Sequence, residues 1–172
     1  MMRPMRWIVM VALLSLSLLL VACGGNEYDA GTVEKNLRAS QVGKVGGLPL
    51  GKATCPKDVT LTEGFTFECT LLIDGTPAPY TVTLTNVKAD MVHFEAEPAK
   101  AIIPSASVVK YVTDNLNPSL ARRLKTDVTC GEEKLFIVDP GTKIGCIVTI
   151  DGQQNQVSLV VKNTQGLVQI EK

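Results

Sequence analysis

The sequence predicts an α+β protein of two tandem small units, each a helix packed on a roughly four-stranded antiparallel sheet with one internal disulfide. Three observations predict this fold. The chain of 172 residues aligns with itself at an offset of 75 to 77 residues, both copies contain stretches of alternating apolar and polar residues, and both contain two cysteines. We divide the chain into a leader at residues 1–22, a tether at residues 23–31, a first repeat unit at residues 32–98 and a second at residues 99–172.

The first element is a leader. Arg3 and Arg6 form its basic start, and residues 7–21 follow without a charged side chain. As a helix these residues would reach roughly 22 Å, which is shorter than the hydrocarbon core of a bilayer at about 30 Å. A short apolar stretch behind a basic start is typical of a signal peptide rather than of a permanent transmembrane anchor.

The leader ends in the tract Leu20-Val21-Ala22-Cys23, which resembles the bacterial lipobox. The resemblance implies that the thiol of Cys23 receives diacylglycerol and that cleavage makes Cys23 the mature N-terminus. Acyl chains such as palmitate would then anchor a lipoprotein at the extracytoplasmic face of the cell membrane, because at least two chains are buried. The alternative is ordinary secretory cleavage after Ala22, which would leave Cys23 as a free thiol.

The two copies match most clearly around their cysteines. Cys55 aligns with Cys130 at an offset of 75 residues, and Cys69 aligns with Cys146 at 77 because the second copy has two extra residues in the loop between them. The following Asp-Gly pair also matches at 77, whereas the returning strands align at 75, with residues 76–79 absorbing the difference. Further matched pairs are Thr32-Val33 with Ser107-Val108, Lys35 with Lys110, Leu37 with Val112, Thr54 with Thr129, Gly64 with Gly141, Ile73 with Ile150, Asp74-Gly75 with Asp151-Gly152, Val82 with Val157 and Leu84 with Leu159.

Each copy begins with a predicted helix. Thr32 and Ser107 are good N-cap residues, and apolar residues follow each of them at helical spacing. The tract Asn117-Pro118 should end the second helix and start a short one through Leu124, and the Gly-rich stretch at residues 43–51 should form a loop. The apolar stripes are Val33 and Leu37 in the first helix, and Val108, Val112 and Leu116 in the second.

Alternating strands follow the helices, each with one buried and one solvated face. An Asp-Gly hairpin turn follows the first of them in both copies, with a longer loop expected in the first copy because of Pro77 and Pro79. Last short strands are expected at residues 91–96 and 167–170. The buried faces are Phe65, Phe67, Cys69, Leu71 and Ile73, then Tyr80, Val82 and Leu84 in the first copy, and Ile144, Cys146, Val148 and Ile150, then Val157, Leu159 and Val161 in the second.

The four cysteines other than Cys23 allow three pairings, and the repeat favours equivalent bonds inside each unit, Cys55–Cys69 and Cys130–Cys146. Units of about 75 residues bury little surface, and closing a loop of roughly 15 residues stabilises a fold by about 3 kcal/mol. Neither pair has the CxxC spacing of a redox site, and the chain has a single histidine. Structural disulfides of an oxidising, extracytoplasmic compartment are therefore favoured over redox or metal chemistry.

The motifs of the first copy resemble a catalogued family. They are the tract Thr54-Cys55-Pro56, then Gly64-Phe65-Thr66-Phe67-Glu68-Cys69, then Asp74-Gly75 and Tyr80-Thr81-Val82-Thr83. This pattern resembles the actinobacterial lipoprotein domain known as domain of unknown function 4333, over residues 28–97 and, more weakly, over residues 103–172. The second copy departs from it at Gly131, Thr142 and Ile144. The resemblance implies an exported, often lipid-anchored helix-plus-sheet module in two copies, and it supplies no reaction and no catalytic residue.

Little in the sequence points to catalysis. The single histidine, His93, lies in an alternating strand, where it should share the solvated face with Met91 and Glu95, and no nucleophile motif accompanies it. The balance of 17 basic and 17 acidic residues argues against nucleic-acid binding. We expect neither a cofactor nor a bound metal, and no enzymatic activity.

The compact basic patch in the sequence is Arg122, Arg123 and Lys125. It is a candidate contact for an anionic surface such as lipid headgroups or cell-wall polymer, and the alternative is an ordinary solvated helix end. We predict a non-catalytic, membrane-anchored binding or scaffold module of the cell envelope, with an envelope protein or a cell-wall ligand as partner. The loops at residues 43–51 and 118–125, which differ between the copies, are candidate contacts. The alternatives are a carrier of a lipidic or cell-wall ligand and a small envelope enzyme.

Overall fold

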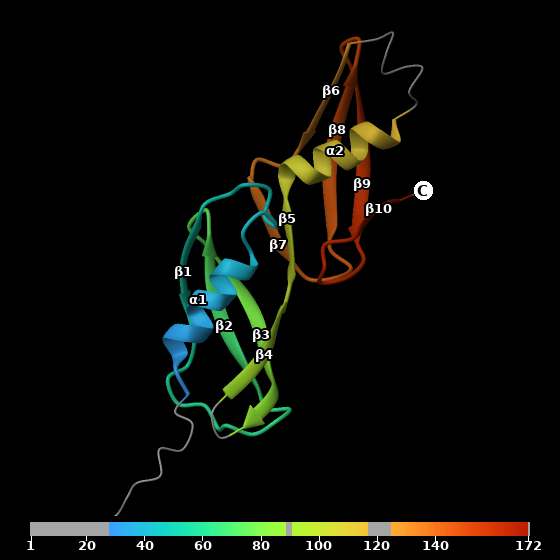
Figure 1. Ribbon diagram of the computed structural model, residues 1–172. Coiled ribbons are helices and arrows are strands. Elements are labelled where there is room, and N and C mark those ends of the chain that lie inside the picture. Colours follow the sequence, from blue (N-terminus) through green and yellow to red (C-terminus); the bar gives the residue numbers. More distant parts are fainter. Residues whose placement is uncertain (1–27, 89–90, 117–124, 172) are drawn as a thin grey trace, which may run out of the picture.

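The computed structural model describes residues 28–88, 91–116 and 125–171. These residues form two short helices and antiparallel strands, arranged in two four-stranded sheets and one two-stranded sheet (Figure 1). This agrees with the α+β class predicted from the sequence. The elements are α1 (Ala30–Ser40), β1 (Leu50–Thr54), β2 (Thr66–Ile73), β3 (Thr76–Lys88), β4 (Met91–Pro98), β5 (Ala101–Pro104), α2 (Ser105–Asn115), β6 (Thr126–Cys130), β7 (Leu135–Val138), β8 (Lys143–Ile150), β9 (Gln153–Val161) and β10 (Val168–Ile170).

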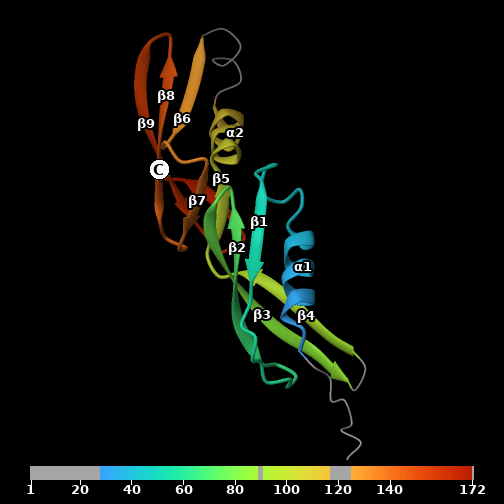
Figure 2. The ribbon, with the colours of Figure 1, turned by 90° about the vertical axis from the view of Figure 1, so that its left-hand side faces the viewer.

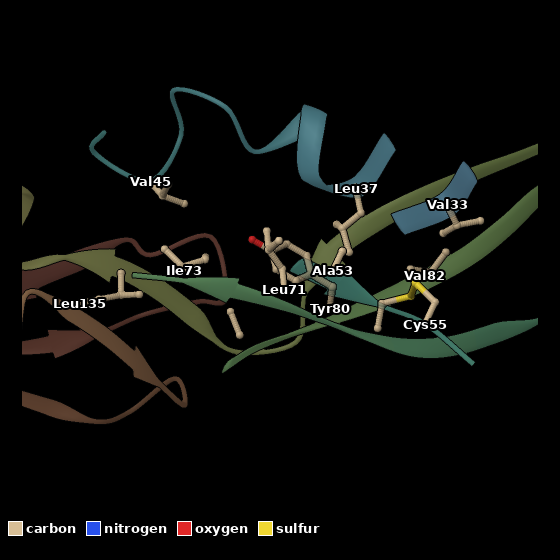
Figure 3. Packing of buried hydrophobic residues seen from close by; sticks show 12 residues of the cluster. Val33, Leu37, Val45, Ala53, Cys55, Leu71, Ile73, Tyr80, Val82 and Leu135 are labelled. Atoms are coloured by element: carbon tan, nitrogen blue, oxygen red, sulfur yellow. A yellow bond between two sulfur atoms is a disulfide. The ribbon is translucent and has the colours of Figure 1, made fainter. Parts of the chain in front are cut away.

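The first sheet has the strand order β1-β2-β3-β4, and α1 packs against β1 and β2. Val33 and Leu37 are the buried residues of α1, as their spacing predicts. Alternation also holds along β2 and β3, except that Phe65 is 39% exposed and lies before β2. Figure 3 shows the resulting core between the helix and the sheet. Its buried residues are Val33, Leu37, Val45, Ala53, Cys55, Cys69, Leu71, Ile73, Ala78, Tyr80, Val82 and Leu135.

The second large sheet has the strand order β10-β9-β8-β6, and α2 contacts β6 and β5. Val108 and Val112 are buried and Leu116 is half-buried, in agreement with the predicted stripe. The second core consists of Ala101, Ile103, Val108, Val112, Cys130, Ile144, Cys146, Val148, Leu159, Val161 and Val168.

Both helices begin earlier than the sequence predicts. The N-cap of α1 is Asp29, whose carboxylate accepts hydrogen bonds from the backbone N–H groups of Gly31 at 3.0 Å and Thr32 at 3.2 Å. Thr32 lies inside the first turn, and its hydroxyl donates to the same carboxylate. In the second copy β5 runs directly into α2 through Pro104, so Ser107 is also inside the helix rather than at its cap. The N–H of Ser105 donates instead to the backbone oxygen of Lys134, 2.9 Å away.

The two Asp-Gly turns have the same length, which corrects the prediction of a longer loop in the first copy. Asp74 and Gly75 have φ angles of 49° and 80°, and Ile73 pairs directly with Thr76. Positive φ at both turn residues is the type I′ geometry that fits the twist of a hairpin. Pro77 and Pro79 therefore lie in β3 itself. They occupy alternate positions whose missing N–H would point away from β2, and β4 pairs with β3 only from Tyr80 onward.

Because the turns are equal, the offset of 77 residues continues into the returning strands, and the predicted return to 75 is wrong. Cys69 pairs with Tyr80, and Cys146 pairs with Val157. The hydrogen bonds beyond these strands repeat in the same way. Gly64 N–H donates to the oxygen of Leu84 at 2.7 Å, and Gly141 N–H donates to that of Val161, also at 2.7 Å.

The two disulfides join neighbouring strands of the large sheets. Cys55, directly after β1, bonds to Cys69 in β2, and Cys130 in β6 bonds to Cys146, its register partner in β8. All four cysteines of these disulfides are buried. Each bond therefore fixes an edge strand to the strand beside it, in the pairing that the repeat predicts.

The two-stranded sheet of β5 and β7 lies between the two larger sheets (Figures 1 and 2). Neither strand was predicted from the sequence. Leu135 of β7 is buried in the first core, with Ile137 and Ile102 packed against it. The alternate residues Phe136 and Val138 pack against the second core, which also contains Ala101 and Ile103. The two faces of this small sheet thus contribute to two different cores.

Among the described residues, no helix is long and apolar enough to cross a bilayer.

Candidate binding groove

Figure 2 shows α1 beside β1, the edge strand of the first sheet. An open groove lies between the side chains of these two elements. Its larger part has a volume of about 560 Å³, and an adjoining hollow has about 450 Å³. Both parts share Lys35, Arg38 and Leu50. The larger part is also lined by Ala39, Val42, Gly43, Val45, Gly47 and Leu48, and the smaller part by Gly31, Glu34, Gly51, Lys52 and Ala53.

Helical geometry places the groove residues of α1. Val33 and Leu37 face the core, so Lys35, Arg38 and Ala39 lie on the exposed side of the helix. Asp29 fixes the start of α1, and the hydrogen bonds from Thr32 and then Gly31 lower the pKa of its carboxyl group. By fixing where α1 begins, Asp29 also helps to fix the position of Lys35 and Arg38 along the groove.

The loop after α1, residues 41–49, supplies apolar side chains that line the larger part of the groove. It buries Val45 and half-buries Leu48, while Val42 remains 71% exposed. Gly46 allows the loop to turn, since its φ is +64° and a Cβ there would lie 3.0 Å from the Cβ of Pro104. The prediction that residues 43–51 form a loop holds up to Pro49, after which Leu50 and Gly51 belong to β1.

Two side chains of α1 cap the backbone of the edge strand. The guanidinium of Arg38 donates to the backbone oxygen of Leu50 from Nη2 at 3.2 Å and from Nε at 3.3 Å. The carboxylate of Glu34 accepts from the backbone N–H of Cys55 at 3.0 Å. Glu34 and Arg38 lie one turn apart, so a single helix face protects both ends of β1 from pairing with another strand.

The groove carries more positive than negative charge. Lys35, Arg38 and Lys52 are exposed along it, and its acidic member, Glu34, is half-buried and engaged by the backbone of Cys55. Neither Lys35 nor Lys52 has an ion pair or hydrogen bond within residues 28–88, 91–116 and 125–171. The arrangement places cationic groups beside apolar side chains, a combination that can bind an amphiphilic anion.

The aligned positions in the second copy do not form a basic groove. Lys110 aligns with Lys35, but its ammonium lies 2.6 Å from the carboxylate of Asp114. Thr113 takes the place of Arg38, and Asp127 takes the place of Lys52. Among the described residues, the three cationic positions of the groove therefore keep their free positive charge in the first copy and not in the second.

A third hollow, of about 370 Å³, lies between α1 and β4 and includes His93. His93 and Glu95 are exposed and alternate with half-buried neighbours, as predicted; the side chain of Met91 lies outside the described residues. Over the described part of the chain, no group of three or more His, Cys, Asp or Glu side chains could hold a metal ion. Asp58, Glu132 and Glu133, which follow the first cysteine of each copy, are exposed.

The residues singled out from the sequence as a lipidation site and as a basic patch fall mostly outside the described residues. Cys23, Arg122 and Arg123, together with the predicted short helix through Leu124, lie outside the described residues. Lys125 is exposed, and its backbone N–H donates to the carboxylate of Asp151 at 3.0 Å. The loop at residues 43–51 was predicted as a contact from the sequence, whereas Lys35, Arg38 and Lys52 were not. A charged helix face preceding a Gly-rich loop is the sequence signal for them.

Comparisons with known proteins concern the same half of the chain. No curated protein and no solved structure matches the chain. A family model does match, and it begins within the predicted leader. Residues 9–89 match the family described as Domain of unknown function (DUF4333), so the chain is similar to that family from the apolar stretch before Cys23 to the end of β3.

Proposed function

We propose that this protein is a lipid-anchored lipoprotein of the extracytoplasmic face, which acts as a non-catalytic binding module of the cell envelope. The observation that carries the proposal is the pair of buried disulfides, one in each large sheet. Disulfides persist in oxidising compartments outside the cytoplasm. A basic, apolar leader that ends in the lipobox-like tract before Cys23 provides a route to that compartment and an anchor there.

The extent of the family match supports the anchor. The family model includes the apolar residues 9–21, Cys23, and both cysteines of the first disulfide. The matched range thus runs from the predicted leader into the folded unit.

The groove supports a binding role. Lys35 and Arg38 line the same hollow as apolar side chains of the loop after α1, Lys52 lines the adjoining hollow, and the carboxylate of Glu34 is engaged by the backbone N–H of Cys55. Such a surface can hold a charged and partly apolar partner without forming or breaking bonds.

We further propose that the chain contains one unit twice, each a helix on a four-stranded sheet. The equal Asp-Gly turns, the equivalent disulfides and the hydrogen bonds of Gly64 and Gly141 support this duplication. Divergence of the groove positions between the copies then suggests that the first unit contacts the partner and the second extends the scaffold.

Metabolic labelling with an alkyne-tagged palmitate tests the anchor. Wild-type protein should carry the label, fractionate with membranes, and be digested by protease added to cells without their wall. Cys23→Ala should abolish the label, whereas the double variant Cys55→Ser with Cys69→Ser should keep it if any of the protein survives. Unlabelled wild-type protein, or label that persists in Cys23→Ala, would contradict the proposal.

A further inference from the structure

The occupant of the α1–β1 groove can be inferred from its charge. Lys35 and Arg38 of the helix line both hollows of the groove, and Lys52 of the edge strand lines the smaller one with them. Arg38 uses Nε and Nη2 for the backbone of Leu50, which leaves further N–H groups of its guanidinium for a ligand. The groove is therefore complementary to negative charge.

The apolar side chains next to these cations indicate that the bound anion also has an apolar part. Val42 is 71% exposed, and Leu48 and Leu50 are half-buried in the same groove. A large exposed apolar side chain beside basic residues is the composition of a surface that sits at the boundary between lipid headgroups and acyl chains.

The length of chain before α1 places the groove close to a membrane. Six residues lie between Cys23 and Ala30, which makes seven steps along the backbone, and a fully extended chain covers at most about 3.5 Å per step. Whatever its conformation, that segment holds the start of α1 within about 25 Å of a lipid on Cys23. This step rests on the proposed function, because it requires the anchor.

The edge strand argues against an extended peptide as the occupant. A peptide that adds to a sheet needs free backbone groups on the edge, but Arg38 and Glu34 already bond the oxygen of Leu50 and the N–H of Cys55. The side chains that line the groove are available, while the backbone at both ends of β1 is occupied.

We propose that the α1–β1 groove docks on anionic phospholipid headgroups of the membrane that anchors the chain. Lys35, Arg38 and Lys52 contact the phosphate groups, and Val42 points toward the acyl chains. Docking holds the first sheet at the bilayer surface. The aligned positions of the second copy lack these free cations, because Asp114 pairs with Lys110 and Asp127 replaces Lys52.

Photo-crosslinking in vesicles tests the docking. The full chain carries p-benzoylphenylalanine at residue 42, in vesicles of phosphatidylcholine alone or mixed with phosphatidylglycerol, and mass spectrometry identifies the attached lipid. We expect crosslinks to phosphatidylglycerol, which Lys35→Gln with Lys52→Gln should reduce at least fivefold, since each cation near an anionic surface contributes about a fivefold change in affinity. These two side chains have no partner in the described residues, so their replacement should leave the fold intact.

Two matched controls use the second copy. Lys110→Gln at the aligned position should leave the crosslinks unchanged, and the same photoreactive residue at Ile147, which is 40% exposed, should give none above background. Equal crosslinking to both lipids, insensitivity to the Lys35 and Lys52 replacements, or equal yield at residue 147 would each overturn the proposal. So would crosslinks in intact cells that join residue 42 only to a polypeptide.

The label on Cys23 is measured in the same samples. Loss of that label with crosslinks retained would refute the anchor but not the docking, and the opposite result would refute the docking alone.

Discussion

Tyr28 has an apolar environment that suits its ring but not its hydroxyl. The ring packs edge-on against Phe67, with centroids 5.6 Å apart, while the hydroxyl oxygen is buried without a hydrogen-bond partner. Desolvation, followed by the charges of Glu34 and Asp29, raises the pKa of this hydroxyl. An unpaired buried hydroxyl costs about 1–3 kcal/mol, and removing it recovers part of that cost.

We therefore predict that Tyr28→Phe raises the free energy of unfolding by about 1 kcal/mol. Urea denaturation followed by circular dichroism measures the change. Tyr111→Phe is the matched control and should have little effect, because Tyr111 is half-buried against the second core and its hydroxyl is not a buried group without a partner. A clear loss of stability in Tyr28→Phe would mean that the hydroxyl has a favourable partner after all.

Tyr80 predicts how stability depends on alkaline pH. Burial raises the pKa of its hydroxyl from 10.0 to about 12. The unfolded chain therefore loses this proton at lower pH than the folded chain, so the stability from Tyr80 is fully present below pH 10 and falls as the pH rises toward about 12. Denaturation at a series of pH values above 9 should show this decline. Tyr80→Phe should flatten it, and a Tyr80→Phe variant with the same slope would refute the assignment.

At the scale of elements, the disulfides have the clearest energetic role. The Cys55–Cys69 bond closes a loop with a sequence separation of 14 residues and ties the edge strand β1 to β2. We predict that Cys55→Ser and Cys69→Ser each destabilise the first sheet by about 3 kcal/mol and to a similar degree. Hydrogen exchange of the β1 and β2 amides measures the effect. Alkylation of Cys69 in the folded wild-type protein would contradict the pairing.

The capped edge of β1 leads to a prediction about association. Glu34→Ala with Arg38→Ala would leave the oxygen of Leu50 and the N–H of Cys55 without partners at the edge of a sheet. Free edges pair with other strands, so we expect this variant to form dimers or larger species at concentrations where the wild type does not. Analytical ultracentrifugation measures this, with Thr113→Ala in α2 as the aligned control. A double variant that sediments like the wild type would show that the caps do not prevent association.

Several elements were predictable because their signals are local. Alternation along β2 and β8, the Asp-Gly turns and the stripes of both helices depend on residues a few positions apart. The wrong predictions came from competing local signals. Thr32 is a good N-cap residue, but Asp29 takes that position and accepts hydrogen bonds from two backbone N–H groups. Pro77 suggested a loop, but it lies in the first part of β3, where β4 does not pair and no N–H is needed.

At the scale of the whole molecule, the small sheet of β5 and β7 was beyond local prediction. The run Leu135-Phe136-Ile137-Val138 is apolar at every position, because one face contributes to each core. A short run that is apolar at every position can be a strand buried on both faces or a buried piece of helix. The sequence does not distinguish the two, because it does not show the cores that cover the run. The groove was missed for the same reason: Lys52 and Lys35 are distant in the sequence, and only the packing of α1 on β1 places them together.

Leu135 tests this connection. It is 8% exposed and belongs to the first core, although it follows the second helix. We predict that Leu135→Ala lowers the free energy of unfolding by about 2–3 kcal/mol and shifts the amide resonances of β2, including Ile73, in NMR spectra. Figure 3 shows Leu135 beside Ile73 at one end of the cluster. Shifts confined to residues 101–171 would contradict a shared core.

This interlocked sheet also sets the order in which the protein can mature. If the chain is exported N-terminus first, as proposed, residues 28–98 leave the cytoplasm before Leu135 does. The first core is therefore without the side chain of Leu135 during translocation. The Cys55–Cys69 bond joins residues that emerge almost together, and it can hold β1 on β2 through this interval. The disulfide thus stabilises the first sheet before its core is complete, and β7 then adds the last buried residue, Leu135.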